Sequence, residues 1–308
     1  MKQSSPKRSK MKLFAPEYYS DFKCIADKCR HSCCIGWEID IDGETLTKYS
    51  EMNAEYAGNI RASIEQGDAP HFKLCADGRC AHLDDLGLCR IISNIGEGAL
   101  CAICREHPRF YHTACGKREV GLGLCCEESC RIVLSSDGYG DFTEIGELDD
   151  EGYEFDFDSA AQRAKIYSIL SDRDLPYDER LQKIYEIHGF TAETFASDGW
   201  NEILEDLEYL EEEHRALICD FSDASADGHE KELERALAYF VYRHCSPAEN
   251  AEEFRTGLGF ALFCERLLSS MAKNNPATPI TDLARILSEE IEYSEDNCEA
   301  IKTEIMFL

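Results

Sequence analysis

Apolar residues recur at helical spacing throughout the C-terminal half of the chain. Ile203, Leu207, Leu210 and Leu217 show the pattern. Positions i, i+3, i+4 and i+7 lie on one face of an α-helix, which can then pack on a core. The spacing predicts helices over residues 159–170, 177–188, 200–219, 230–245, 248–271 and from 280 to the C-terminus, the last with a break near Ser294. We therefore expect an α-helical domain over residues 157–308.

The N-terminal half has a different pattern, in which short apolar runs are separated by glycine-rich and charged turns. Its strand-like alternation, as in EIDID at residues 38–42, is too short to predict a parallel sheet. A helix over residues 45–57 is expected. Another should carry Cys101 and Cys104 and end before Pro108, because proline disfavours a helical residue before it.

These patterns divide the chain into four segments. Residues 1–23 read as a basic tail and lead-in, residues 24–134 as a loop-rich cysteine domain, and residues 135–156 as a linker or surface hairpin, because they are rich in Gly, Asp and Glu. Residues 157–308 form the helical domain. The predicted fold is mainly α, with a loop-rich, cysteine-bearing metal-binding domain packed on an acidic α-helical domain.

Cysteine is concentrated in one part of the chain. Residues 24–130 hold 13 of the 17 cysteines. The N-terminal sequence MKQSSPKRSK is not followed by the apolar run of an export signal, so we expect a cytoplasmic protein. Thiols stay reduced in the cytosol, so a cluster there more often binds metal or carries out redox chemistry than forms disulfides. Disulfides remain the alternative for an exported chain.

The charge of the chain is strongly negative and uneven. The formal net charge is −29, and residues 131–308 contribute −27. Such a surface repels nucleic acid and anionic membranes, and no apolar stretch approaches the ~18 residues of a membrane span. It favours a lysine-bearing protein partner, although a solvated acidic face that confers solubility is the commoner role of any single glutamate.

The cysteines occur as close pairs, which is how thiolates usually reach a tetrahedral metal centre. The spacing gives Cys24 with Cys29, Cys33 with Cys34, Cys101 with Cys104, and Cys126 with Cys130. Thiolate ligation suits both a structural zinc ion and an iron–sulfur cluster, so spacing leaves the metal open. Five histidines lie among the cysteines, and we interpret them as surface residues or partners of ligands rather than ligands: His31, His71, His82, His107 and His112.

Several stretches together resemble a known family. YYSDFKCIADKCRHSCCIGWEIDID, CAHLDDLGLCRI, LCAICREHPRF and GKREVGLGLCC are similar to the CxxCxxCC zinc- or iron-chelating family, in its flagellin lysine-N-methylase branch. The similarity continues in YFVYRHCSPAEN and ILSEEIEYSEDNCEAI. The resemblance implies a metal-ligand set in which Cys101 counts only as a frequent variant: Cys24, Cys29, Cys33, Cys34, Cys80, Cys89, Cys104 and Cys126.

The resemblance also implies an activity, namely methyl transfer to lysines of flagellin in the bacterial flagellum. It implies S-adenosylmethionine as donor and an iron–sulfur cluster, 4Fe–4S favoured, with zinc as the alternative. The residues themselves show neither a strand followed by G-x-G-x-x-G nor the C-x3-C-x2-C signature of radical enzymes that use this donor. Arg109 and Arg243 are candidates for binding the donor carboxylate.

Two other classes of function fit the same residues. One is a noncatalytic zinc- or iron-binding protein whose helical half recognises a partner. The other is a thiol-rich protein that handles metal or electrons. Fold alone does not choose among the three, because function depends on the site.

Overall fold

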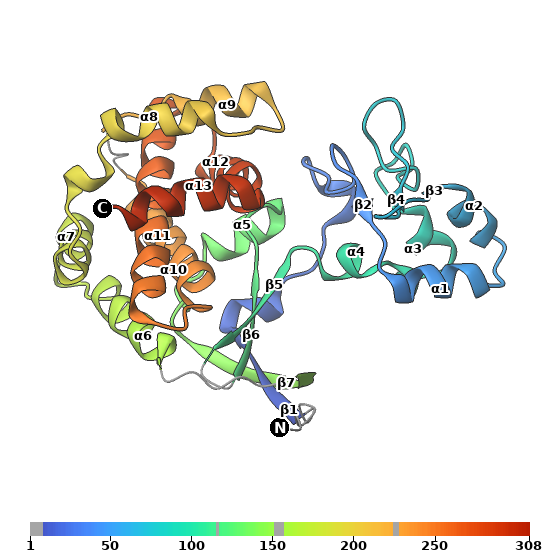
Figure 1. The fold of residues 1–308 in the computed structure, drawn as a ribbon, viewed down its shortest axis with the longest axis horizontal. Coiled ribbons are helices and arrows are strands. Elements are labelled where there is room, and N and C mark those ends of the chain that lie inside the picture. Colours follow the sequence, from blue (N-terminus) through green and yellow to red (C-terminus); the bar gives the residue numbers. More distant parts are fainter. Residues whose placement is uncertain (1–8, 115–116, 151–156, 224–227) are drawn as a thin grey trace, which may run out of the picture. The chain divides into compact units, whose positions relative to one another are not determined.

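The computed structural model describes residues 9–114, 117–150, 157–223 and 228–308, which fall into two compact units (Figure 1). The cysteine unit is Lys23–Arg109. The helical unit comprises the chain up to Phe22 and from Phe110 to Leu308. The described residues form thirteen α-helices and seven short strands, so the prediction of a mainly α protein is confirmed.

Helices make up most of the helical unit. Their bounds are α5 (Glu127–Val133), α6 (Ser159–Leu170), α7 (Tyr177–His188), α8 (Ser197–Asp206), α9 (Glu212–Cys219), α10 (Glu230–Cys245), α11 (Ala251–Asn274), α12 (Ile280–Leu287) and α13 (Glu295–Met306). Figure 1 shows the long α11 among the other helices of this unit. Phe260, Phe263 and Leu267 of α11 are fully buried in its core. No helix in the described ranges is long and apolar enough to cross a lipid bilayer.

The predicted helices over residues 159–170, 177–188 and 230–245 are confirmed to the residue. The helix predicted over residues 200–219 is instead broken into α8 and α9. Between them, the N–H of Glu208 donates to Asn297 Oδ1 at 3.1 Å and the N–H of Leu210 donates to Glu290 Oε2 at 2.7 Å. Side chains from the C-terminal helices thus take up backbone groups that a continuous helix would have used.

Of two further helix boundaries, the start of α11 differs from the sequence expectation and the break near Ser294 matches it. Helix α11 starts at Ala251 rather than at residue 248, because the Asn250 side chain accepts hydrogen bonds from the N–H groups of Glu252 and Glu253 and caps the helix there. The expected break near Ser294 is confirmed. One turn of π-helix (Ser288–Glu292) follows α12, and Ser294 caps α13.

A four-stranded sheet in the described residues was not expected from the sequence. Its order is β5 (Arg109–Ala114), β6 (Lys117–Leu122), β1 (Ser9–Pro16), β7 (Phe142–Asp150). Strand β1 runs parallel to β6 and antiparallel to β7. Part of the predicted N-terminal tail therefore forms β1 and part of the predicted linker forms β7, while residues 1–8 and 151–156 lie outside the described residues.

The cysteine unit is built from short elements. Its described strands form one sheet in the order β2 (Ile39–Asp40), β4 (His71–Phe72), β3 (Ile64–Glu65), and its helices are α1 (Gly43–Glu51), α2 (Ala57–Ala62), α3 (Arg90–Asn94) and α4 (Ala102–Glu106). Helix α4 ends before Pro108, as expected. The unit ends at Arg109, whereas the sequence-based domain continues to residue 134.

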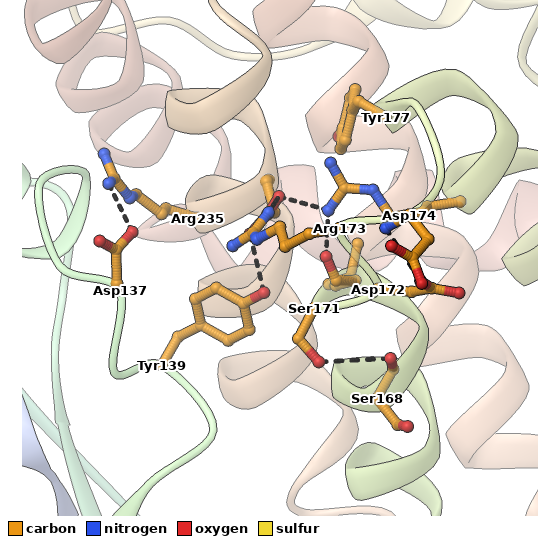
Figure 2. A network of polar contacts seen from close by, with 12 residues as sticks. Asp137, Tyr139, Ser168, Ser171, Asp172, Arg173, Asp174, Tyr177 and Arg235 are labelled. Atoms are coloured by element: carbon orange, nitrogen blue, oxygen red, sulfur yellow. Dashed lines mark hydrogen bonds and ion pairs between the residues drawn. The ribbon is translucent and has the colours of Figure 1, made fainter.

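A buried carboxylate ties together two helices and two loops of the helical unit. Glu234 of α10 is 2% exposed and accepts hydrogen bonds from Arg173 and from the Tyr139 hydroxyl, each at 2.8 Å. Arg180 of α7 also pairs with it. Figure 2 shows Tyr139 and Arg173 in this network, with Arg235 pairing with Asp137 beside it. Burial alone would raise the pKa of Glu234, but the two arginines and the tyrosine lower it.

We expect Glu234→Gln to destabilise the protein by about 3 kcal/mol, because it leaves the buried guanidinium of Arg180 without its countercharge. Urea unfolding of the helical signal measures this loss. Glu232→Gln on the same helix is the matched control and should change the unfolding free energy by less than about 0.5 kcal/mol. Equal effects of the two substitutions would contradict the prediction.

Candidate functional site

Five cysteines lie in or against the small core of the cysteine unit. Cys80 and Cys101 are buried within it, and Cys34, Cys89 and Cys104 pack on it half-buried. The N–H of Cys80 donates to the carbonyl of Cys34 at 2.8 Å, which joins two distant loops. A charge on any one of these thiols would be felt by others of the group. We call these five residues the thiol cluster.

Two hydrogen bonds between thiols affect the acidity of the cluster. A hydrogen bond with Cys104 lowers the pKa of Cys101 to about 7, and the same bond raises the pKa of Cys104. A hydrogen bond with Cys33 likewise lowers the pKa of Cys34 to about 7, whereas burial raises the pKa of Cys80 to about 11. The cluster therefore contains thiols that ionise near neutral pH beside thiols that do not.

Asp42 positions the turn that carries Cys101. It caps α1, where its Oδ1 accepts from the N–H of Thr45 at 2.8 Å, and its Oδ2 accepts from the N–H of Ala102, the first residue of α4, at 2.9 Å. Although burial acts to raise it, these hydrogen bonds lower the pKa of Asp42 to about 2. The Tyr49 hydroxyl donates to the carbonyl of Ala99 at 2.7 Å and holds the same loop.

The structure brings together four of the eight cysteines in the resemblance-based ligand set. Cys24 and Cys33 are exposed, and Cys29 is half-buried, with its thiol 3.2 Å from the His31 carbonyl. Cys126 belongs to the helical unit, where it precedes α5. Among the described residues, no three Cys, His, Asp or Glu side chains are arranged to hold a metal ion. The ligand assignment stays a prediction.

Cys101 is the residue that the resemblance-based set leaves out. It is fully buried and hydrogen-bonded to Cys104. It therefore belongs to the thiol cluster as much as the four ligand-set members Cys34, Cys80, Cys89 and Cys104 do. The C-x2-C spacing already pairs it with Cys104, and this local signal identifies it better than the resemblance does.

Histidines add little to the cluster. Both ring nitrogens of His82 are occupied, by the hydroxyls of Tyr56 at 3.1 Å and Ser63 at 2.6 Å. Burial lowers the pKa of His82 to about 4, so the ring is neutral at physiological pH. His107 is also neutral for the same reason, and its buried Nε2 has no hydrogen-bond partner among the described residues.

The two arginines predicted to bind the donor lie in different units. Arg109 closes the cysteine unit and donates to the carbonyl of Arg105 at 3.4 Å. Arg243 of α10 donates to the Tyr239 hydroxyl at 2.9 Å, and its Nε lies 3.5 Å from Glu292 Oε1. Its guanidinium also stacks over the Tyr293 ring. These contacts give Arg243 a structural role within the helical unit.

Comparison with known proteins gives three informative relatives. The chain is 30% identical over 161 residues to the flagellar biosynthetic protein FliU of Salmonella muenchen. The aligned part covers 50% of this chain and 94% of FliU. This chain belongs to the FliU and lysine-N-methylase family. It is also 30% and 31% identical over 127 residues to the proteins named Lysine-N-methylase of Salmonella typhimurium and Salmonella choleraesuis.

The matches to the two lysine-N-methylases cover only part of each chain. The aligned part spans 39% of this chain and about a third, 32%, of the length of the two lysine-N-methylases. No protein-family model matches the chain, and no solved structure matches it.

We expect Asp42→Ala to destabilise the cysteine unit by about 2 kcal/mol, because one carboxylate caps α1 and fixes the start of α4. The contribution should be present above pH 3.8 and lost as the pH falls towards 2, since the pKa of Asp42 is lower in the folded protein. Hydrogen exchange of the amides of Thr45 and Ala102 measures the loss. Asp68→Ala, in the same unit, is the control, and protection unchanged in Asp42→Ala would contradict the prediction.

Proposed function

We propose that the protein is a lysine N-methyltransferase that acts on flagellin, with S-adenosylmethionine as the methyl donor. The observation that carries the proposal is membership of the family: the match covers nearly all of FliU, whose name is flagellar, and extends to proteins named Lysine-N-methylase. The negative charge of the helical half supports a substrate that presents lysines.

The activity further requires a neutral lysine. An ε-ammonium with a pKa of ~10.4 must lose its proton before its lone pair can attack a methyl group. Desolvation or a nearby positive charge lowers the pKa of an amine and makes this loss easier.

We propose in addition that the thiol cluster holds a metal centre, preferably an iron–sulfur cluster and otherwise zinc. The donor chemistry fits either, because thiolates are the ligands that both prefer. The geometry requires adjustment, since Cys101 is hydrogen-bonded to Cys104 and no set of side chains among the described residues is arranged as a metal site. Such a centre, when bound, would crosslink the loops that carry Cys34, Cys80, Cys89 and Cys104, and the exposed Cys24 and Cys33 or the half-buried Cys29 of the same unit would complete it.

A noncatalytic metal-binding interaction protein is the second candidate. The observation that favours it is the partial match, which leaves two thirds of each lysine-N-methylase without a counterpart in the alignment. Such a protein would share part of the family's length and bind flagellin without transferring a methyl group.

The metal proposal predicts a specific response to cysteine replacement. Cys34→Ser and Cys104→Ser should each lower bound metal at least several-fold and destabilise the cysteine unit, because metal binding contributes directly to folding. Cys264→Ser is the matched control: this thiol is fully buried in the helical unit, so it should retain metal. Metal and acid-labile sulfide analysis of anaerobically purified protein, with its visible spectrum, measures the outcome. Metal retained in both cluster variants would contradict the assignment.

The activity proposal predicts label transfer. Incubating metal-loaded protein with methyl-labelled S-adenosylmethionine, a reductant and its cognate flagellin should label lysines, and initial rates should fall as salt screens the acidic surface. Peptide mass spectrometry locates the label. Flagellin bound without label would favour the noncatalytic candidate.

A further inference from the structure

The helical unit contains a cavity that the proposed function has not used. It has a volume of about 540 Å³, within the range of small-molecule sites, and lies where the end of α10, the start of α11 and α13 meet. Gly257 makes this junction possible: a Cβ on it would come within 2.2 Å of the carbonyl oxygen of His244. Only glycine lets α11 approach α10 this closely.

One wall of the cavity is provided by His244, whose side chain is 6% exposed. Its Nε2 lies 2.7 Å from Glu292 Oε1, in the π-helical turn, and its ring packs against the Phe260 ring at an interplanar angle of 56°. Glu292 is wholly buried and also accepts from the Tyr239 hydroxyl at 3.2 Å. The nearby Arg243 favours its charged form.

These contacts determine which ring nitrogen can take a ligand. Burial lowers the pKa of His244 to about 4, with Lys302 and Arg243 acting in the same direction and Glu292 opposing them, so the ring is neutral. A neutral ring bonded to a carboxylate carries its proton on Nε2. Its Nδ1 is then a hydrogen-bond acceptor with no hydrogen-bond partner among the described residues.

The other walls carry charges of both signs. Lys302 of α13 is the one cation among the lining residues, and its ammonium lies 5.1 Å from the centre of the Phe260 ring. Glu253 is engaged by Asn250 at the helix cap, whereas Glu252 has no side-chain partner among the described residues. Apolar surface comes from Pro247, Ala248 and Met306, so the cavity can accept an ionic head and an apolar chain.

We propose that this cavity binds the head group of an α-amino acid. The carboxylate would pair with Lys302, and the ammonium would donate to His244 Nδ1 and face Glu252. A simple alkylammonium would leave Lys302 without a countercharge, and a simple carboxylate would leave Glu252 without one. A ligand that carries an ammonium and a carboxylate on the same carbon satisfies both walls.

Two kinds of molecule present this head group, a free amino acid such as methionine and a methyl donor that carries a methionine moiety. The second source rests on the proposed function and would locate the donor, for which the sequence shows no phosphate- or nucleotide-binding motif. The volume is large enough for more than the amino acid alone.

Calorimetry on the purified full chain, with its metal as isolated, tests the inference. We expect S-adenosylmethionine or methionine to bind, n-butylammonium and butyrate to bind at least 10-fold more weakly, and Lys302→Met to lose at least 10-fold in affinity. Lys183→Gln on α7, which does not line the cavity, is the matched control. Thr256→Trp fills the cavity from its wall without altering the pair formed by His244 and Glu292, and it should abolish binding. Circular dichroism verifies that each variant is folded.

The same variants distinguish free methionine from S-adenosylmethionine as the ligand, and they test the cavity separately from the proposed methyltransferase activity. Methionine and S-adenosylmethionine both bound, with the second tighter, would make the cavity the donor site, whereas methionine alone would make it an amino-acid site. Binding lost in Thr256→Trp while flagellin is never labelled would support the inference and reject the methyltransferase. The inference would be overturned if neither compound bound. It would also be overturned if Thr256→Trp and Lys302→Met both labelled flagellin with an unchanged KM for the donor.

Discussion

The helical unit depends on how buried charges along α10 are compensated. Glu234 near its start and Arg243 near its end are charged and largely removed from water, where an unpaired charge would cost several kcal/mol. Glu234 pairs with arginines of α7 and of the chain before it, whereas Arg243 and the neutral ring of His244 both contact Glu292 in the π-helical turn. These contacts restrict the rotation of α10 about its axis, because the two sets of partners lie on separate elements.

A similar ion pair links the sheet to the helices. Arg163 of α6 donates to both carboxylate oxygens of Glu119 on β6, at 2.7 and 2.8 Å, and both side chains are almost fully buried. The cysteine unit has no comparable ion pair among its described residues; its small core is made of aromatic and aliphatic side chains with thiols between them. With few apolar residues to bury, such a unit gains little stability from its core, and this is the physical reason to expect that the thiols do more than fill space.

The sequence predicts most where the determinants are local. Helices α6, α7 and α10 follow from apolar spacing within their own residues. The sheet could not be predicted in the same way, since Leu13 of β1 pairs with Arg118 on one side and with Gly146 on the other. The break between α8 and α9 escaped for the same reason, because it is made by Glu290 and Asn297, which are remote in sequence.

The candidate sites also combine features that are local in the sequence with features that depend on distant segments meeting. The cysteine pairs are visible as spacing, yet which thiols gather depends on three loops meeting, and the contact of Cys80 with Cys34 spans 46 positions. The cavity beside His244 has even less local signature: its cation, its carboxylates and its ring come from three helices, and the glycine that permits their approach is one of 20 in the chain. A binding site assembled from helix ends leaves no G-x-G-x-x-G to read. The lack of that motif therefore argues against a strand-to-helix nucleotide site and carries no argument against donor binding as such.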